Sequence, residues 1–223
     1  RAEGLSGTVN AGVTYVFDQL PEQDSSPYTA DHIIEGVVEV GQSGNSIAPA
    51  GDVNGDGADD ILLGSHYTPQ GDGLFGEAHV MLGPLPPTTS LSNSSAIWRA
   101  TTPADALGRR VLGIGDINDD GLDDVAISAK HDESNGIRAG AVYVFLAPFS
   151  GTMELTSADI VIQGSQAFDR AGITFNLIGD IDGQGRADLV IGSSPESNAL
   201  GVSNSIYLLE DFLLFSSGQL PGE

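Results

Sequence analysis

The chain has 223 residues, of which 40% are hydrophobic, so it can bury a core of domain size. Its 31 acidic and 8 basic residues give a net charge of −23, which disfavours nucleic acid and anionic membranes as partners and favours divalent cations. It has no cysteine to form disulfides, and no apolar run approaches the roughly 18 residues of a membrane-spanning helix.

The first unit contains two predicted strands, at 13–17 and around Ile34. The second unit has four, and its last two, at 77–81 and around Trp98, repeat that pair. The third unit also has four, at 111–115, 124–128, 141–146 and 159–163, and the fourth unit has three, the last at 205–209. These runs are short, rich in Val, Ile and Tyr, and bounded by glycine and polar residues. No long segment has a helical period, so the chain is predicted to be all-β with about 13 strands.

The units follow a repeat of 64 residues, because related acidic segments begin at Asp52, Asp116 and Asp180. Self-similarity without insertions indicates one structural unit that recurs along the chain. The predicted units are approximately 1–43, which is incomplete, then 44–107 and 108–171, and finally 172–223, which is also incomplete.

Several strands are apolar at both alternating positions, as in Val125-Ala126-Ile127, which is typical of sheets buried on both faces. Four-stranded antiparallel sheets stacked around an axis bury both faces, whereas a sandwich exposes one face of each sheet. The sequence therefore predicts a partial β-propeller of about 3.5 blades. The chain begins at Arg1 without methionine, so we expect a segment of a longer protein. Since an open stack exposes a sheet face and unpaired edges, either further blades or a second copy should complete the ring.

The acidic segments have the residue types of calcium-binding loops. Positions 1, 3, 5 and 9 carry oxygen-bearing side chains, position 6 is glycine, and position 7 offers a backbone carbonyl. Ca²⁺ takes 6–8 oxygen ligands, and the glycine permits the turn that brings them together. The sequence thus predicts up to three Ca²⁺ ions, held by Asp52, Asn54, Asp56, Ala58 and Asp60, by Asp116, Asn118, Asp120, Leu122 and Asp124, and by Asp180, Asp182, Gln184, Arg186 and Asp188.

These loops differ from an EF-hand, which has glutamate at position 12 and flanking helices. Position 12 is Leu63, Ile127 or Ile191, inside a predicted strand, so a β-hairpin loop closed by the position-9 aspartate is expected. The oxygen-only ligand set argues against zinc and copper, and Mg²⁺ demands tighter octahedral geometry. An ordinary hairpin turn could explain one such loop, but three with the same pattern and spacing favour calcium.

The repeats and their acidic loops resemble the FG-GAP repeat family, which includes the propellers of integrin α-subunits and bacterial integrin-α-like proteins. The resemblance covers nearly the whole chain and implies a seven-bladed propeller with calcium loops between the first two strands of certain blades. The chain departs from the family signature at the residue before the glycine that starts each blade, where Ser43, Leu107 and Ala171 replace phenylalanine. Without Arg-Gly-Asp and without cysteine, the chain is more similar to a bacterial integrin-α-like protein than to an animal integrin.

The connections between second and third strands vary in sequence while the repeat around them does not. They span 66–75, 130–139 and 194–203, and the resemblance places them opposite the calcium loops, where partners bind. Candidate contacts for a protein or glycan ligand are Asp72, Asp132, Glu133 and Glu196. The alternative is that these loops are solvent-exposed and vary in sequence without a role in binding.

No motif of a zinc peptidase or an α/β-hydrolase is present, and the four histidines share no repeat register, so the chain is predicted not to be an enzyme. Trp98 is expected in the core. The resulting prediction is an extracellular or cell-surface adhesion or recognition module that does not insert into membranes. Its ions would hold the blade hairpins rigid. The alternatives are an accessory propeller of a secreted enzyme and a partial propeller that closes by self-association.

Overall fold

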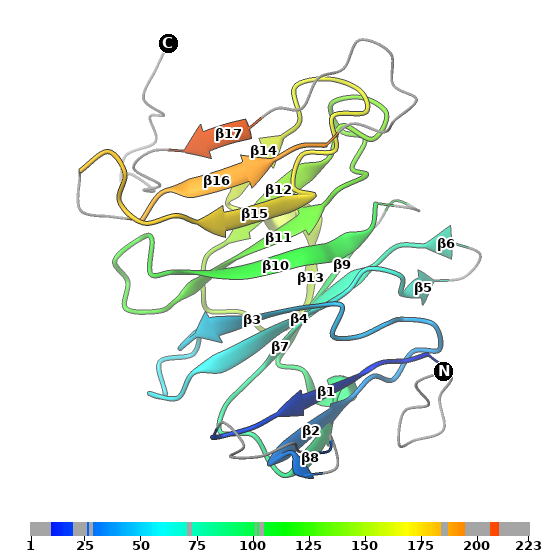
Figure 1. The fold of residues 1–223 in the computed structure, drawn as a ribbon, viewed down its shortest axis with the longest axis vertical. Helices are drawn as coiled ribbons and strands as arrows, with labels where there is room; N and C mark the ends of the chain where they lie inside the picture. Colours follow the sequence, from blue (N-terminus) through cyan, green and yellow to red (C-terminus); the bar gives the residue numbers. More distant parts are fainter. Residues whose placement is uncertain are drawn as a thin grey trace.

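The computed structural model describes residues 10–19, 26, 29–70, 73–100, 102, 105–183, 187–194 and 206–209. Within these residues the regular elements are strands and short 3₁₀ turns, among them η2 (Leu91–Asn93) and η3 (Leu155–Ser157). Four sheets succeed one another along the long axis of the molecule in sequence order (Figure 1). In this described part, no helix is long enough and apolar enough to pass through a lipid bilayer.

The first two sheets use residues from the N-terminal half of the chain together with one later strand. The first sheet has the order β1-β2-β8, with β1 (Val13–Val16), β2 (His32–Glu35) and β8 (Thr88–Ser90). The second has the order β13-β9-β7-β4-β3, with β3 (Ser46–Gly51), β4 (Asp60–Ser65), β7 (Glu77–Met81), β9 (Ala96–Arg99) and β13 (Gly151–Glu154). A small hairpin of β5 (Pro69–Gln70) and β6 (Gly73–Leu74) extends from the connection between β4 and β7.

The remaining two sheets are antiparallel meanders. The third sheet joins β10 (Leu107–Gly115), β11 (Asp124–Ala129), β12 (Ala141–Phe145) and β14 (Ile160–Gln163) in sequence order. The fourth joins β15 (Thr174–Leu177), β16 (Leu189–Gly192) and β17 (Ile206–Leu209).

The connections before β9 and before β14 each add a parallel strand to the preceding sheet, a feature that the sequence did not predict. β8 pairs with β2, and β13 pairs with β9, so that Gly151 lies opposite Ala96. Each of these strands covers the outer edge of a neighbouring sheet, where unpaired amides and carbonyls would otherwise face solvent. The first, second and third sheets are therefore joined by backbone hydrogen bonds as well as by side-chain packing.

The core lies between the sheets, and the strand alternation divides it into layers. On β12, Tyr143 and Phe145 face the layer shared with the second sheet, whereas Val142 and Val144 face the layer shared with the fourth. All five residues of β12 and all six of β11 are buried, as expected for a sheet covered on both faces. The chain is therefore all-β and forms a partial β-propeller, as the sequence pattern predicted.

Trp98 anchors the layer between the second and third sheets. Its side chain is fully buried, with ring centroids 5.2 Å from Phe145 and 5.1 Å from Phe149. Tilted and edge-on aromatic pairs at these separations add about 0.5–1.5 kcal/mol each beyond the burial of apolar area. The predicted core position of Trp98 is thus confirmed.

Candidate metal centre

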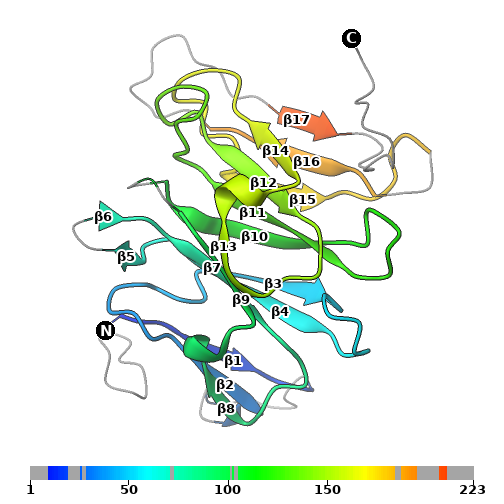
Figure 2. The ribbon, with the colours of Figure 1, turned by 180° about the vertical axis from the view of Figure 1, so that it is seen from behind.

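The three acidic segments connect the first two strands of successive sheets. Loop 1 (52–60) joins β3 to β4, loop 2 (116–124) joins β10 to β11, and loop 3 (180–188) joins β15 to β16, with 184–186 outside the described residues. All three lie along the same edge of the stack, on the left in Figure 1 and on the right in Figure 2. The repeat therefore places equivalent acids in a row.

Loop 1 folds around the carboxylate of Asp52, its first residue. Asp52 Oδ1 accepts hydrogen bonds from the amides of Gly55 (2.7 Å) and Asp56 (3.1 Å), and Oδ2 accepts one from Gly57 (2.8 Å). These amides, that of Gly57 first, lower the pKa of Asp52 because they stabilise the charged form. Gly57 adopts a φ of +87°, a conformation that residues other than glycine rarely adopt.

Asn54 and Asp56 complete the outer part of loop 1. Asn54 Oδ1 accepts from the Asp56 amide at 2.9 Å, and Asn54 Nδ2 donates to Asp56 Oδ2 at 2.9 Å. The amide of Ala58 donates to Asp56 Oδ1 at 2.9 Å. The side chains at positions 1, 3 and 5 are thus tied to one tight turn.

Asp60 closes loop 1 from inside the fold. Its side chain is buried, and its two oxygens accept hydrogen bonds from the amides of Val53 (3.0 Å) and Gly83 (2.9 Å). Burial raises the pKa of Asp60, and the charges of Asp56 and Asp52 add to that effect against the two amide bonds. A cation near these carboxylates would reduce both the free-energy cost of burying the Asp60 charge and its repulsion from Asp52 and Asp56.

Loop 2 repeats this geometry. Asp116 Oδ1 accepts from Asp120 (3.1 Å) and Oδ2 from Gly121 (2.8 Å), and Asn118 Nδ2 donates to Asp120 Oδ2 at 2.9 Å. Asp124 is fully buried, and it accepts from the amides of Ile117 (3.0 Å) and Ala147 (2.8 Å). Burial raises the pKa of Asp124 to about 6, with contributions from the nearby charges of Asp120 and Asp116.

Loop 3 brings three carboxylates to one point. An oxygen from each of Asp180, Asp182 and Asp188 lies within 4.8 Å of the others, and this group could hold a metal ion. Asp180 is exposed and Asp188 buried, so the group spans the boundary between core and solvent. The amide of Gly183 donates to Asp180 at 2.7 Å and that of Ile181 to Asp188 at 2.8 Å, as in the other loops.

The structure places thirteen of the predicted ligands in these loops, and Gln184 and Arg186 lie outside the described residues. Asn54 and Asn118 contribute amide oxygens in loops 1 and 2, where loop 3 has Asp182. Carboxylate, amide and backbone oxygens are hard donors, and the donor set therefore fits Ca²⁺ or Mg²⁺ and not a soft metal ion.

Sequence reasoning missed Asp123, which lies at position 8 of loop 2. Its Oδ2 accepts a hydrogen bond from the backbone amide of Asp52, in the neighbouring loop, at 2.8 Å. The sequence signal was present, because Asp59 and Asp123 occupy the same position of the repeat, but a local pattern does not reveal a contact between units.

The opposite edge of the stack contains acids with a different environment. Asp132, predicted as an exposed ligand contact, is instead buried, and it accepts hydrogen bonds from Tyr143 Oη (2.6 Å) and the Ser134 amide (2.9 Å). Together with the buried Asp105 it lines a cavity of about 280 Å³. Glu133 is exposed, and Asp72 and Glu196 lie outside the described residues. Asp132 is buried because its partner Tyr143 lies on β12, 11 residues further along the chain, and its role as a ligand contact stays a prediction.

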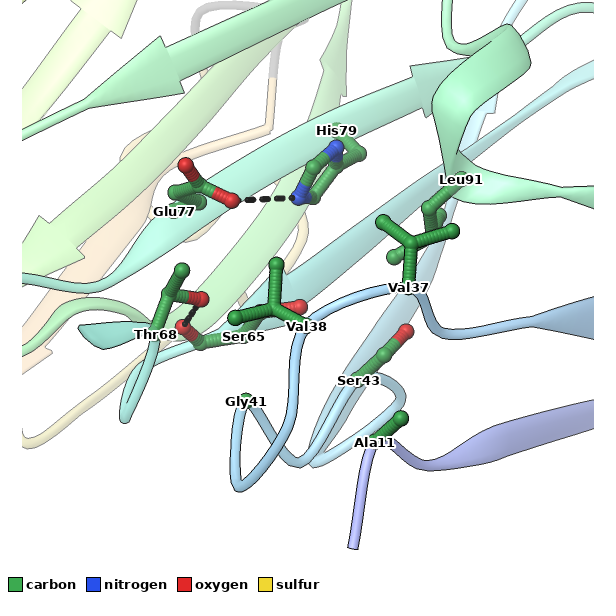
Figure 3. Close-up of a pocket in the computed structure, with 10 residues that line it drawn as sticks. All are labelled: Ala11, Val37, Val38, Gly41, Ser43, Ser65, Thr68, Glu77, His79 and Leu91. Atoms are coloured by element: carbon green, nitrogen blue, oxygen red, sulfur yellow. Dashed lines mark hydrogen bonds and ion pairs between the residues drawn. The ribbon is translucent and has the colours of Figure 1, made fainter. Parts of the chain in front are cut away.

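Figure 3 shows a second buried group, in which Glu77 and His79 point toward each other beside a cavity of about 10 Å³. Glu77 bonds His79 Nε2 (3.3 Å) and Arg99 Nε (2.7 Å). Burial by itself raises the pKa of Glu77, but these two partners outweigh it and the pKa is lowered. His79 Nδ1 also lies 3.2 Å from Ser94 Oγ, an order of groups known from serine hydrolases.

That resemblance does not extend to catalytic geometry. Ser94 Oγ donates to the Leu91 carbonyl at 2.6 Å, so its proton is directed away from His79. The adjoining cavity has room for about one water molecule and none for a substrate. The group is better explained as a buried ion pair that fixes β7 against β9.

Comparisons with known proteins agree with the repeat and the fold. No protein-family model matches the chain. The chain is 30% identical to integrin alpha-IIb of Mus musculus over 175 residues, which is 75% of this chain and 16% of that protein. It is 31% identical to integrin alpha pat-2 of Caenorhabditis elegans over 173 residues, covering 70% and 14% of the two chains. Phosphatidylinositol-glycan-specific phospholipase D of Mus musculus is 31% identical over 152 residues, covering 66% and 18%. The chain thus spans less than a fifth of the length of these relatives.

Proposed function

This chain is an integrin α-like domain of the FG-GAP type, and from that premise we propose that it binds calcium and serves as a recognition module of an extracellular or cell-surface protein. The observation that carries the proposal is the row of three equivalent acidic loops on one edge of the stack. Two of them repeat the same hydrogen bonds, and the third gathers three carboxylates.

The proposed ligands in each loop are the side-chain oxygens at positions 1, 3, 5 and 9 and the carbonyl at position 7. Ca²⁺ suits these loops because it accepts 6–8 oxygens in flexible geometry, and Mg²⁺ requires a stricter octahedron. Extracellular calcium modules commonly have dissociation constants on the order of 10⁻⁴–10⁻³ M, and we expect that range here. Bound ions would offset the repulsion among the carboxylates of each loop and make the hairpins rigid.

The opposite edge is the proposed recognition surface for a protein or glycan. It presents the connection at 130–139, where Glu133 is exposed on a frame fixed by the buried Asp132. Loops held by a rigid scaffold are the usual location of binding residues. We propose no catalytic role for this segment, and we expect further blades or a second copy to complete the ring.

Calorimetric titration of the protein with CaCl₂ tests this function. The wild-type chain should bind up to three ions, and Asp56→Ala, Asp120→Ala and Asp182→Ala should each lose one. Glu133→Ala is the matched control, because it removes an exposed acid at the opposite edge and should leave the stoichiometry unchanged. Absence of binding at millimolar calcium, or loss of the same ion in the control, would contradict the proposal.

The match to a phospholipase D supports a second candidate, an accessory propeller of a secreted enzyme. The longer coding sequence around this segment decides between the two, because a flanking catalytic domain would favour the enzyme. Closure by self-association is a third candidate. Sedimentation with and without calcium measures it directly, and a monomer under both conditions would reject it.

A further inference from the structure

Loops 1 and 2 are joined by a reciprocal pair of hydrogen bonds. The amide of Asp52 donates to Asp123 Oδ2 at 2.8 Å, and the amide of Asp123 donates to the Asp52 carbonyl at 3.1 Å. The first predicted ligand of loop 1 is therefore held, through its backbone, by a residue of loop 2. Both bonds cross the boundary between the second and third sheets, where β3 lies beside β10 (Figure 1).

The backbone of loop 1 is shaped to admit Asp123. Gly51 has a φ of +78°, and a Cβ at this position would overlap the Asp123 carboxylate. Glycine is required there both for the conformation and for the close approach. One turn further on, a Cβ on Gly55 would lie 3.2 Å from Leu122 Cδ2, so residues 122 and 123 both pack against loop 1.

The third loop has no equivalent group. Position 8 is Asp59 in loop 1, Asp123 in loop 2 and Ala187 in loop 3, so loop 3 offers no carboxylate to the backbone of loop 2. A Cβ on Gly115, the loop 2 residue equivalent to Gly51, would meet only Asp123 Oδ1 of its own loop, at 4.0 Å, and no residue of loop 3. The described loops thus comprise a bonded pair and a third loop without this bond.

We propose that Asp123 is a positioning residue for the calcium site of loop 1 and couples the occupancy of loops 1 and 2. Asp123 lies between Leu122 and Asp124, two predicted ligands of loop 2, so a fixed loop 2 orients the carboxylate that holds Asp52. Because coupling between two sites is reciprocal, occupancy of either loop favours occupancy of the other. The inference rests on the proposed calcium binding.

The test is a CaCl₂ titration of the folded protein, followed by NMR at the amides of Gly57 and Gly121. Each of these amides donates to the position-1 aspartate of its own loop, so each reports one site. Asp123→Ala should raise the midpoint at Gly57 roughly tenfold, since a charge-assisted hydrogen bond is lost from loop 1. Asp123→Asn keeps an oxygen acceptor and should recover part of that loss.

Asp59→Ala is the matched control, because it removes the acid at the same position of loop 1. It keeps the bond between Asp123 and the Asp52 amide, so the midpoints at Gly57 and Gly121 should both stay close to their wild-type values. A shift at Gly121 alone in Asp123→Ala, with Gly57 at its wild-type midpoint, would overturn the inference.

Hydrogen exchange in calcium-free protein separates this inference from the proposed function. The Asp52 amide should exchange at least about tenfold faster in Asp123→Ala, because its acceptor is gone. Unchanged exchange at Asp52 refutes the positioning role whatever calcium does. If exchange is faster in Asp123→Ala but the NMR signal of the Gly57 amide in the wild-type protein does not respond to CaCl₂, calcium binding is refuted, and the coupling with it.

Discussion

The two edges of the sheet stack both collect acidic residues, but they give these residues different partners. At the loop edge, Asp52 and Asp116 accept hydrogen bonds from the backbone amides of their own turns. At the opposite edge, Asp132 is bonded to Tyr143, and Asp169 to Ser193 at 2.8 Å. Asp52 and Asp116 are half-buried, so an ion at the loop surface can reach the lone pairs that remain, whereas Asp132 and Asp169 are buried. The buried acids instead serve the packing of the fold.

Acidity alone therefore does not identify a metal site in this chain. The loop acids recur with the repeat, and the bonds they accept come mainly from backbone amides. The opposite-edge acids use side chains from other strands, as Glu77 does with Arg99 of β9. Calcium should therefore act on one edge and leave the other unchanged, which yields three predictions of decreasing size.

Calcium removal has the largest expected effect. With free calcium at 100 times the dissociation constant, each occupied loop adds about 2.7 kcal/mol to the free energy of unfolding. Thermal unfolding in calcium and in chelator should differ accordingly, at about 2–4 °C per kcal/mol for a chain of this size. Tyr143→Phe is the matched variant at the opposite edge, because it removes the bond to Asp132 and should destabilise the protein equally in both conditions.

Equal melting temperatures with and without calcium would remove the distinction between the edges. If Tyr143→Phe lost stability in calcium but not in chelator, the two edges would be energetically coupled.

Asp105 gives the second prediction, at the opposite edge. Burial first, and the charge of Asp132 second, raise its pKa from an ordinary 3.8 to about 7. The folded state therefore binds more protons than the unfolded state between pH 4 and pH 7, so this group destabilises the fold as the pH rises through that window. Asp105→Asn cannot ionise, and its free energy of unfolding relative to wild type should increase by about 2–4 kcal/mol from pH 4 to pH 7.5.

Chemical denaturation in chelator at both pH values measures this difference without a contribution from calcium. Glu133→Gln, at an exposed neighbouring acid, is the control and should show little pH-dependent change. A relative stability of Asp105→Asn that fell with rising pH would show that the Asp105 carboxylate gains a partner when it ionises.

Much of the fold could be predicted from the sequence because its determinants are local and repeated. The apolar runs of β11 and β12 indicated sheets covered on both faces, and both strands are buried throughout. The loop sequence likewise placed Asp52 and Asp60 at the two ends of one hairpin, between β3 and β4. These features depend on residues close together in the chain.

The missed features depend on contacts between units. Strand β13 pairs with β9, more than 50 residues earlier in the chain, and its own sequence has no strand pattern strong enough to predict that. Asp132 looked like a loop acid because its bond to Tyr143 requires the strand and the loop to be placed together. Asp123 was visible as an acid, but its acceptor role toward Asp52 appears only when two sheets are stacked.

The smallest predicted effect compares the loops with one another at position 3. Loops 1 and 2 have Asn54 and Asn118, and loop 3 has Asp182. Calcium affinity in such loops follows the number of charged ligands. Asn118→Asp should therefore strengthen binding in loop 2 by roughly tenfold, about 1.4 kcal/mol, and Asp182→Asn should weaken loop 3 by a similar factor.

The same substitutions should act in the reverse sense without calcium. Asn118→Asp loses the bond from Asn118 Nδ2 to Asp120 and adds a negative charge, so the calcium-free protein should unfold more easily. Asp182→Asn removes one of three close carboxylates and should stabilise the calcium-free fold. Calcium titration and chelator melts of both variants measure the two effects. Changes of the same sign in both conditions would mean that position 3 acts on the turn itself and not on the ion.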